Sequence, residues 1–183
     1  MTELLTAPTR LLHPWRRRAA RRALSARAPR SILVVCHGNI CRSPFAAALL
    51  QRALGPAGIR VHSAGFIGPN RPSPPEAVTA AARYGVNLSD HRSRVLTADL
   101  VRSTDVVVVM DSAQRQEVCD RFGHSPRDVI VLGDLDPAPI EKRAIRDPVD
   151  QGPNAFEASY ARIERCAREL ARALLPAADQ RGK

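Results

Sequence analysis

Residues 36–44 read Cys-His-Gly-Asn-Ile-Cys-Arg-Ser-Pro, and this stretch decides how the rest of the chain is interpreted. It follows the apolar run Ile-Leu-Val-Val at residues 32–35 and precedes an Ala- and Leu-rich segment at residues 45–54. This order predicts a buried strand, a tight loop and a helix. Such a loop points successive backbone N–H groups at one spot, where the helix dipole adds partial positive charge. The stretch therefore predicts a site for an anion.

The residues within the loop fit this geometry. Gly38 and Asn39 tolerate the left-handed backbone that a tight anion-cradling loop requires. Ser43 is expected to be the N-cap of the following helix, and Pro44 is expected to be its first residue. The loop should therefore run directly into a helix N-terminus.

Two side chains of the loop bring reactive chemistry to this anion site. Cys36 places its sulfur beside the helix N-terminus and Arg42, and both favour the nucleophilic thiolate. Arg42 offers a planar fork of N–H donors that matches two phosphate oxygens. A cysteine followed by five residues and an arginine thus describes a site where sulfur attacks phosphorus.

The pattern Cys-x-Gly-Asn-x-Cys-Arg-Ser-Pro after a strand resembles the phosphate-binding loop of the low-molecular-weight protein tyrosine phosphatases. The resemblance implies a phosphatase that hydrolyses phosphotyrosine on proteins through a cysteinyl phosphate, with no metal ion or other cofactor. It implies Cys36, Arg42 and Asp147 as catalytic residues. The residues expected to bind the substrate phosphate are His37, Gly38, Asn39, Ile40, Cys41, Arg42 and Ser43.

Strand-like and helix-like segments alternate from residue 31 onward. Strands are expected at residues 32–35, 59–63, 106–110 and 129–132, and helices at residues 45–54, 76–84, 112–122 and 155–175. This alternation predicts a three-layer α/β fold, in which a four-stranded parallel sheet is flanked by helices on both faces. The family that the motif resembles has this flavodoxin-like arrangement. Ligands of such sheets bind outside the carboxyl ends of the strands, where the Cys36 loop lies.

Length and composition indicate one domain. The chain has 183 residues, enough for a core of its own, and lacks the run of about 18 apolar residues that a membrane-spanning helix needs. Its four cysteines are too few and too scattered for a disulfide scaffold, and none forms the Cys-x2-Cys pair typical of zinc sites. We therefore expect a reducing, cytoplasmic setting, which a nucleophilic thiol needs.

The net charge of +10 is concentrated at the start of the chain. Residues 1–30 contain eight arginines and one glutamate, whereas the remaining residues are nearly balanced. We expect residues 1–30 to be a disordered basic arm, residues 31–176 to be the phosphatase domain and residues 177–183 to be a tail. The alternative for the arm is an amphipathic basic helix that contacts anionic lipid or nucleic acid. We expect no nucleic-acid partner, and membrane contact is the less favoured reading.

The expected chemistry needs an acid, because the oxygen that leaves phosphorus must be protonated. The resemblance selects Asp147, since the family carries its acid in an Asp-Pro pair shortly before the last helix. Pro148 restricts the residue before it to extended geometry, which suits a carboxylate held over a cleft. Asp150 is the nearest rival, and Asp134 and Asp136 are weaker candidates.

Other polar residues are expected to support the loop. By resemblance, Asn39, Ser43, Ser63 and His91 form a hydrogen-bonded set that keeps Asn39 left-handed, and Ser43 also orients the thiolate. Cys41 has two readings of equal weight: it forms a disulfide with the catalytic cysteine under oxidation, or it packs within the loop.

The chain departs from the family where the substrate slot is expected. Many members carry aromatic residues after the Asp-Pro pair, whereas this chain has Val149 and Asp150. Phe66, Phe156 and Tyr160 are the candidates for walls of the slot. The sequence therefore does not decide whether the substrate slot prefers aryl phosphates.

Three other functions remain as alternatives. Arginine phosphatases of this family tend to carry Thr where this chain has Ile40, and arsenate reductases need closely spaced downstream cysteines, whereas Cys119 stands alone. The alternative of another class is a catalytically silent phosphate-binding module.

The expected partner is a phosphorylated protein, with an autophosphorylated tyrosine kinase as the candidate.

Overall fold

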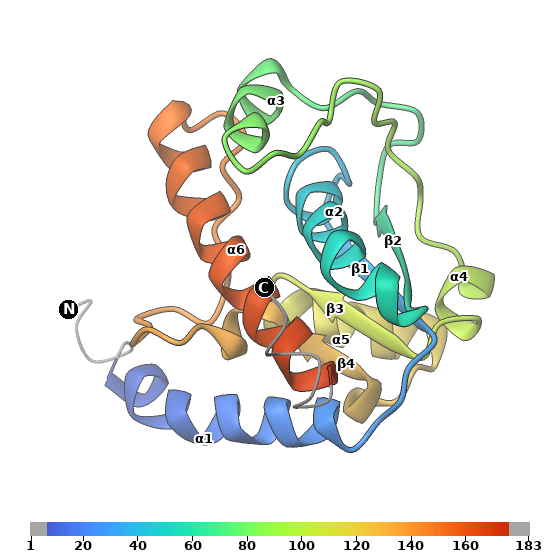
Figure 1. Ribbon diagram of the computed structural model, residues 1–183, viewed down its shortest axis with the longest axis vertical. Coiled ribbons are helices and arrows are strands. Elements are labelled where there is room, and N and C mark those ends of the chain that lie inside the picture. The colour runs from blue at the N-terminus through green and yellow to red at the C-terminus, as the bar shows by residue number, and fades with distance from the viewer. Residues whose placement is uncertain (1–6, 176–183) are drawn as a thin grey trace.

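The apolar run before the loop forms β1 (Ser31–Cys36), in which every residue is buried. The structure, a computed structural model, describes residues 7–175. The remaining strands are β2 (Arg60–Gly65), β3 (Val106–Val109) and β4 (Val129–Val131). All four pair in parallel in the order β2-β1-β3-β4, so β1 lies inside the sheet and its carboxyl end is flanked by those of β2 and β3 (Figure 1).

Helices cover both faces of this sheet, as the sequence predicts. The α-helices after β1 are α2 (Arg42–Leu54), α3 (Pro75–Ala82), α4 (Ala98–Arg102), α5 (Ser112–Phe122) and α6 (Pro153–Leu174). The short 3-10 helices are η2 (Gly55–Ala57), η3 (Pro126–Asp128) and η4 (Leu132–Leu135). Within the described residues, none of the helices combines the length and the apolar character needed to span a membrane. The fold is a three-layer α/β arrangement.

Alternate residues of the strands belong to two separate cores. Ile32 and Val34 pack with α2 and α6, whereas Leu33 and Val35 pack on the other face with residues of α4 and α5. Period-two alternation explains the division, because successive side chains of a strand point to opposite faces. Both faces are apolar, as expected of a parallel sheet covered on both sides.

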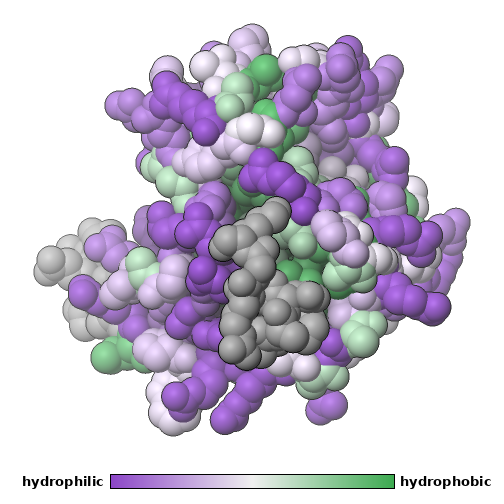
Figure 2. Space-filling model, in the orientation of Figure 1, coloured by the Kyte–Doolittle hydropathy of each residue, from purple (hydrophilic) through white to green (hydrophobic). Residues whose placement is uncertain are grey.

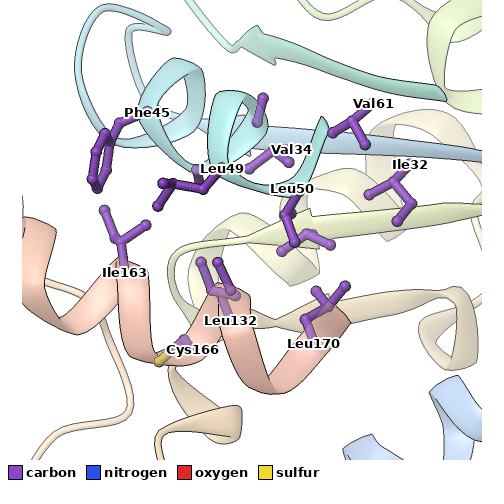
Figure 3. Packing of buried hydrophobic residues seen from close by; sticks show 14 of the residues in the cluster. Ile32, Val34, Phe45, Leu49, Leu50, Val61, Leu132, Ile163, Cys166 and Leu170 are labelled. Carbon is purple, nitrogen blue, oxygen red and sulfur yellow. The ribbon is translucent and has the colours of Figure 1, made fainter. Parts of the chain in front are cut away.

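The larger core ties the C-terminal helix to the helix that follows the loop. Figure 3 shows Phe45, Leu49 and Leu50 of α2 directed toward residues of α6. The Phe45 ring stacks on Tyr160 with centroids 3.9 Å apart and an interplanar angle of 5°. This packing places α6 against the N-terminal end of α2, where the loop ends.

The start of α2 differs from the expectation for Ser43 and Pro44. Cys41 is the N-cap residue, so Arg42 is the first helical residue and Ser43 and Pro44 are the second and third. The Ser43 hydroxyl is engaged instead with Cys36 and Asn39. The sequence located the helix start to within two residues but misassigned its cap, because the partners of Ser43 are set by the folded loop.

The structure corrects the prediction of a disordered arm at residues 1–30 for the part from residue 7 to residue 25. Residues Ala7–Ser25 form helix α1, which packs against α6 and η4. Leu24 is fully buried and Ala20 is nearly so. A helix of charge and alanine has little to bury by itself, and α1 is stabilised by the surface on which it docks. Residues 1–6 and the predicted tail at residues 177–183 lie outside the described part of the chain.

Polar contacts anchor both the middle and the end of α1. Arg17 forms an ion pair with Glu169, a residue of α6 that is only 7% exposed. Ser25 donates a hydrogen bond to the backbone oxygen of Ala173 at 3.1 Å, and Arg27 forms an ion pair with Asp128 at 2.6 Å. These partners belong to the α/β domain that begins at β1, so the basic segment is joined to this domain at several points.

Two substitutions on α1 test this docking. Leu24→Ala should lower the free energy of unfolding by about 2–5 kcal/mol, because it removes a fully buried side chain. The matched change Leu11→Ala, at a residue that is 74% exposed, should alter it by no more than about 0.5 kcal/mol. Urea denaturation measures both values. Equal effects of the two variants would mean that α1 does not pack on the domain.

Candidate active site

The loop after β1 turns on a left-handed residue, Asn39, whose φ is 50°. Its side-chain Nδ2 donates to the hydroxyls of Ser43 and Ser63, each at 2.9 Å. Its Oδ1 accepts a hydrogen bond from the Arg94 backbone N–H at 2.8 Å, and His91 Nε2 lies 2.7 Å from the Asn39 carbonyl oxygen. A left-handed asparagine is uncommon, and these bonds hold it in that conformation.

The structure thus brings together the residues expected to support the loop. The partners of Asn39 come from α2, β2 and the segment between α3 and α4, which are remote in sequence. Arg94 joins the set through its backbone, which no sequence pattern would indicate. A loop held from three directions keeps its backbone N–H groups in place before an anion arrives.

Cys36 occupies the last position of β1 and is almost completely buried. Its Sγ lies 3.0 Å from Ser43 Oγ, at the N-terminal turn of α2. A hydroxyl at this distance stabilises and orients a sulfur that carries negative charge. The Cys36 thiol is therefore directed toward the anion site of the loop by the end of β1, the start of α2 and Ser43.

Gly65 lets the end of β2 approach this loop closely. A Cβ atom at Gly65 would lie 2.7 Å from the Asn39 backbone N and 2.8 Å from the His37 carbonyl oxygen. The next residue, Phe66, donates its N–H to the same His37 oxygen at 2.8 Å. Only glycine fits this contact, so Gly65 is a positioning residue that the motif itself does not contain.

Arg42 begins α2 and is only 4% exposed. Its Nη1 donates to the Ile145 carbonyl oxygen at 3.1 Å, and its Nη2 forms an ion pair with Asp147. The Arg42 Nε has no hydrogen-bond partner within the described residues. A buried guanidinium that retains a free donor is suited to an anion at the loop.

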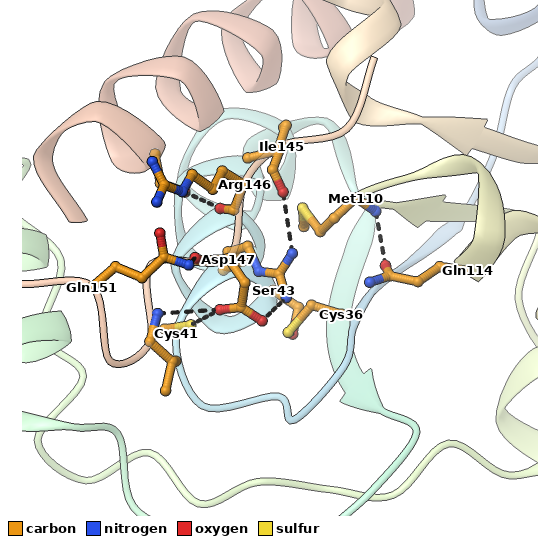
Figure 4. Close-up of polar contacts among 12 residues, drawn as sticks. Cys36, Cys41, Ser43, Met110, Gln114, Ile145, Arg146, Asp147 and Gln151 are labelled. Carbon is orange, nitrogen blue, oxygen red and sulfur yellow. Dashed lines mark hydrogen bonds and ion pairs between the residues drawn. The ribbon is translucent and has the colours of Figure 1, made fainter. Parts of the chain in front are cut away.

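Asp147 lies beside Arg42 because its segment is tied to the sheet and to α6. The Ile145 N–H donates to the Met110 oxygen, at the end of β3, at 2.9 Å. Ser159 Oγ of α6 donates to the Arg146 oxygen at 3.1 Å. Figure 4 shows the Asp147 side chain directed toward the loop cysteines, and this side chain is 40% exposed. The Asp147 carboxyl therefore lies between the buried guanidinium and solvent.

Cys41 differs from Cys36 in its surroundings. Burial, helped by the nearby Cys36 and Asp147, raises the pKa of the Cys41 thiol well above its ordinary range. The Cys41 carbonyl oxygen accepts a hydrogen bond from the Tyr160 hydroxyl at 3.1 Å. Cys41 is therefore a neutral thiol at physiological pH. A disulfide with Cys36 stays a prediction, and both thiols are free in the structure.

Several candidates from the sequence have other roles. Phe156 and Tyr160 were expected as walls of a substrate slot, but their exposed fractions are 2% and 0%, and they pack in the core. Asp134 forms an ion pair with Arg143, and Asp136 forms ion pairs with two arginines of α6. These two aspartates are buried structural groups.

Three residues of the segment after β2 lie near the loop. Phe66, which was expected to form a wall of the substrate slot, is only 8% exposed. The next residue, Ile67, is 44% exposed and faces solvent instead. The Arg71 guanidinium lies 3.4 Å from the position that a Cβ on Gly38 would occupy. No motif in the sequence indicates this second arginine, because it comes from the Pro-rich segment far outside residues 36–44.

A thiol at the N-terminus of a helix, a buried guanidinium and a nearby carboxyl, all at the carboxyl edge of a parallel sheet, define the class of cysteine-dependent phosphatases. A family model described as low molecular weight phosphotyrosine protein phosphatase matches residues 31–180. The chain belongs to this family. The match begins at β1 and does not include α1.

Individual relatives agree with this assignment. A probable low molecular weight protein-tyrosine-phosphatase, EpsP of Ralstonia nicotianae, is 42% identical over 138 residues, which are 74% of this chain and 90% of the relative. The crystal structure of the tyrosine phosphatase AmsI of Erwinia amylovora has a TM-score of 0.73 and 34% identity, and the match covers 81% of this chain and 95% of that one.

A structure of the arginine phosphatase YwlE, a Cys-to-Ser mutant with a phosphorylated active-site serine, has a TM-score of 0.70 and 30% identity. That match covers 79% of this chain and 95% of the other. Both kinds of phosphatase therefore share the fold.

Gly65→Ala tests the close contact beneath the loop. The added methyl group would displace the backbone at Asn39, and a loop misplaced by about 1 Å should lower kcat/KM on the order of 100-fold. The control is Gly58→Ala, whose Cβ would meet nothing within 4 Å but whose φ of 80° costs about 1–2 kcal/mol of stability. Hydrolysis of para-nitrophenyl phosphate and urea denaturation separate the two effects. Full activity in Gly65→Ala would contradict this account of the loop.

Proposed function

We propose that this protein hydrolyses phosphotyrosine on proteins through a cysteinyl-phosphate intermediate at Cys36. The observation that carries this proposal is the ion pair that joins Arg42 of the loop to Asp147, 105 residues away in sequence. It places a carboxyl next to the group that would hold the phosphate. The identity of the family supports the same reaction.

In the first step, the Cys36 thiolate attacks phosphorus opposite the leaving oxygen. The loop N–H groups and Arg42 hold the phosphate oxygens, where charge is greatest in the transition state. As the sulfur–phosphorus bond forms, the phosphorus–oxygen bond breaks, and Asp147 gives its proton to the departing phenol oxygen. The negative phosphate competes with the Asp147 carboxyl for Arg42.

In the second step, the Asp147 carboxylate takes a proton from water as the water oxygen attacks phosphorus. The sulfur–phosphorus bond breaks, inorganic phosphate leaves and the Cys36 thiolate is restored. Ser43, at 3.0 Å, stabilises the thiolate as the leaving group of this step. Arg42 and the loop N–H groups supply the positive charge, so the proposed reaction uses no metal ion.

The proposed substrates are phosphorylated proteins, with an autophosphorylated tyrosine kinase as the specific candidate, and the proposed compartment is the cytoplasm. Exposed Arg71 at the rim of the loop favours peptides with acidic residues next to the phosphotyrosine. The similarity to YwlE supports phosphoarginine as the second candidate. Ile40, which is 7% exposed and apolar, favours the first candidate.

Cys36→Ser should abolish hydrolysis of para-nitrophenyl phosphate, because a serine hydroxyl at this site is not ionised. Wild-type activity should persist in the presence of EDTA and be inhibited by vanadate. Cys41→Ser, which keeps a small neutral group in the loop, should retain most activity. A wild type as inert as Cys36→Ser would show a silent phosphate-binding module instead.

Asp147→Asn should lower kcat for phenyl phosphate by about 10²–10⁴-fold, because the amide cannot protonate the leaving oxygen. The loss should be smaller for para-nitrophenyl phosphate, whose leaving group departs readily as an anion. The rival acid provides the control: Asp150→Asn should retain activity, since asparagine tolerates the φ of 60° found there. Equal losses in the two variants, or no dependence on the leaving group, would reject Asp147 as the acid.

A direct competition between a phosphotyrosine peptide and a phosphoarginine peptide of the same sequence distinguishes the two substrate candidates. We expect a higher kcat/KM for phosphotyrosine. Ile40→Thr should shift the ratio toward phosphoarginine, because it adds a hydroxyl at the loop. A wild-type preference for phosphoarginine would replace the proposed substrate and leave the cysteine mechanism intact.

A further inference from the structure

We propose that the outer face of α1 binds the surface of an anionic membrane. This outer face consists of Leu11, Leu12, Trp15, Arg18 and Arg22. The family match begins at residue 31, so the family accounts for none of these residues.

The docking of α1 determines which side chains face outward. His13, Ala20 and Leu24 are buried against the domain, and Arg17 reaches Glu169 from the same side. These positions follow the spacing of one helix face. Residues 11, 15, 18 and 22 each precede one of these four residues by two positions, so they lie on the opposite face of the helix. All four are exposed.

The N-terminal half of this outer face is apolar. Trp15 is 71% exposed, Leu11 is 74% exposed and Leu12 is 46% exposed. Only one other large hydrophobic residue among the described residues, Ile67, is exposed to a similar extent. In Figure 2, which has the orientation of Figure 1, hydrophobic surface lies at the N-terminal end of α1 among hydrophilic neighbours. Such a cluster marks a contact surface.

The C-terminal half of the outer face is basic. Arg18 and Arg22 have no ion-pair partner within the described residues, whereas Arg17 and Arg21 lie close to Glu169. These four arginines, together with Pro14 and Ser25, line a shallow groove of about 430 Å³. Helix α1 contains no acidic residue. The outer arginines are therefore free to bind anionic groups from outside the chain.

The combination of both halves favours a lipid surface over other anionic partners. An anionic membrane offers phosphate groups for arginines and, a few ångströms deeper, an apolar layer for leucine and tryptophan. A nucleic-acid backbone would use the arginines and leave Leu11 and Leu12 in water. On this one exposed face, the N-terminal apolar residues can enter the interface while the C-terminal arginines bind lipid phosphates at its surface.

The apolar end of α1 lies at the same end of the sheet as the phosphate loop. His13 lies against the backbone of Asp134 in η4, which follows the carboxyl end of β4. Arg27, just past the other end of α1, pairs with Asp128, which precedes β4. Membrane binding would thus hold the site near membrane-bound phosphoproteins. This consequence rests on the proposed function, whereas the binding itself does not.

Trp15 is the single tryptophan of the chain, so intrinsic fluorescence reports directly on this face. The experiment titrates the full-length protein with phosphatidylcholine vesicles and with vesicles that contain phosphatidylglycerol. We expect a blue shift of the emission, quenching by brominated lipids and co-sedimentation with the anionic vesicles alone. Added salt should weaken this binding, because the attraction is partly electrostatic.

The matched variants are Arg18→Gln/Arg22→Gln and, for the same change in net charge, Arg60→Gln/Arg102→Gln at exposed positions outside α1. At about fivefold per arginine, the first pair should weaken vesicle binding roughly 25-fold, and the second should change it little. Leu11→Ser/Leu12→Ser should also weaken binding and abolish the blue shift. Unchanged hydrolysis of para-nitrophenyl phosphate shows that each variant is folded.

Any of four results would overturn the proposal. One is the absence of binding to anionic vesicles, and another is equal binding to neutral and anionic vesicles. The third is an equal loss in both arginine pairs, which would reflect net charge and not α1. Tighter binding to nucleic acid than to vesicles would assign the outer face to that partner instead. None of these results depends on the phosphatase reaction, so the proposed function would stand.

Discussion

The hydrogen bonds that hold Asn39 in a left-handed conformation are the constraint on which the site depends. A residue with a φ of 50° is unfavourable by itself, and here α2, β2 and the segment after α3 all bind it. The loop can then direct its N–H groups inward without reorganising when charge develops. Gly65 permits this arrangement, because any larger residue would push the loop away from β2.

Helix α6 packs in the hydrophobic core and also holds two parts of the candidate active site. Its Tyr160 stacks on Phe45 in the core, and the hydroxyl of the same residue holds the Cys41 carbonyl oxygen. The preceding residue, Ser159, holds the backbone of the segment that carries Asp147. The helix therefore positions the loop and Asp147 relative to each other. Its other end receives α1 through Glu169, so the added N-terminal helix rests on the element that organises the site.

The parts of the site that are contiguous in sequence could be read from it. Cys36, Arg42 and the glycine between them lie in one strand–loop–helix unit, whose conformation follows from local residue preferences. Asp147 was selected only by resemblance to the family, since nothing in its spacing separates it from Asp150. Arg71 and Gly65 gave no signal, because their importance comes from the approach of segments that are remote in sequence.

The sequence by itself determined the α/β class, the four parallel strands and the strand–loop–helix unit around residues 36–44, because apolar periodicity and local backbone preferences act over short distances. The tertiary structure alone decided the state of residues 7–25. The composition of that segment favoured disorder, yet burial of Leu24 and ion pairs with α6 hold it as a helix. The tertiary structure also decided that Tyr160, a fully buried residue, holds the loop through a hydrogen bond to the Cys41 carbonyl oxygen. Such contacts depend on which surfaces meet after folding, and that information is distributed over the whole chain.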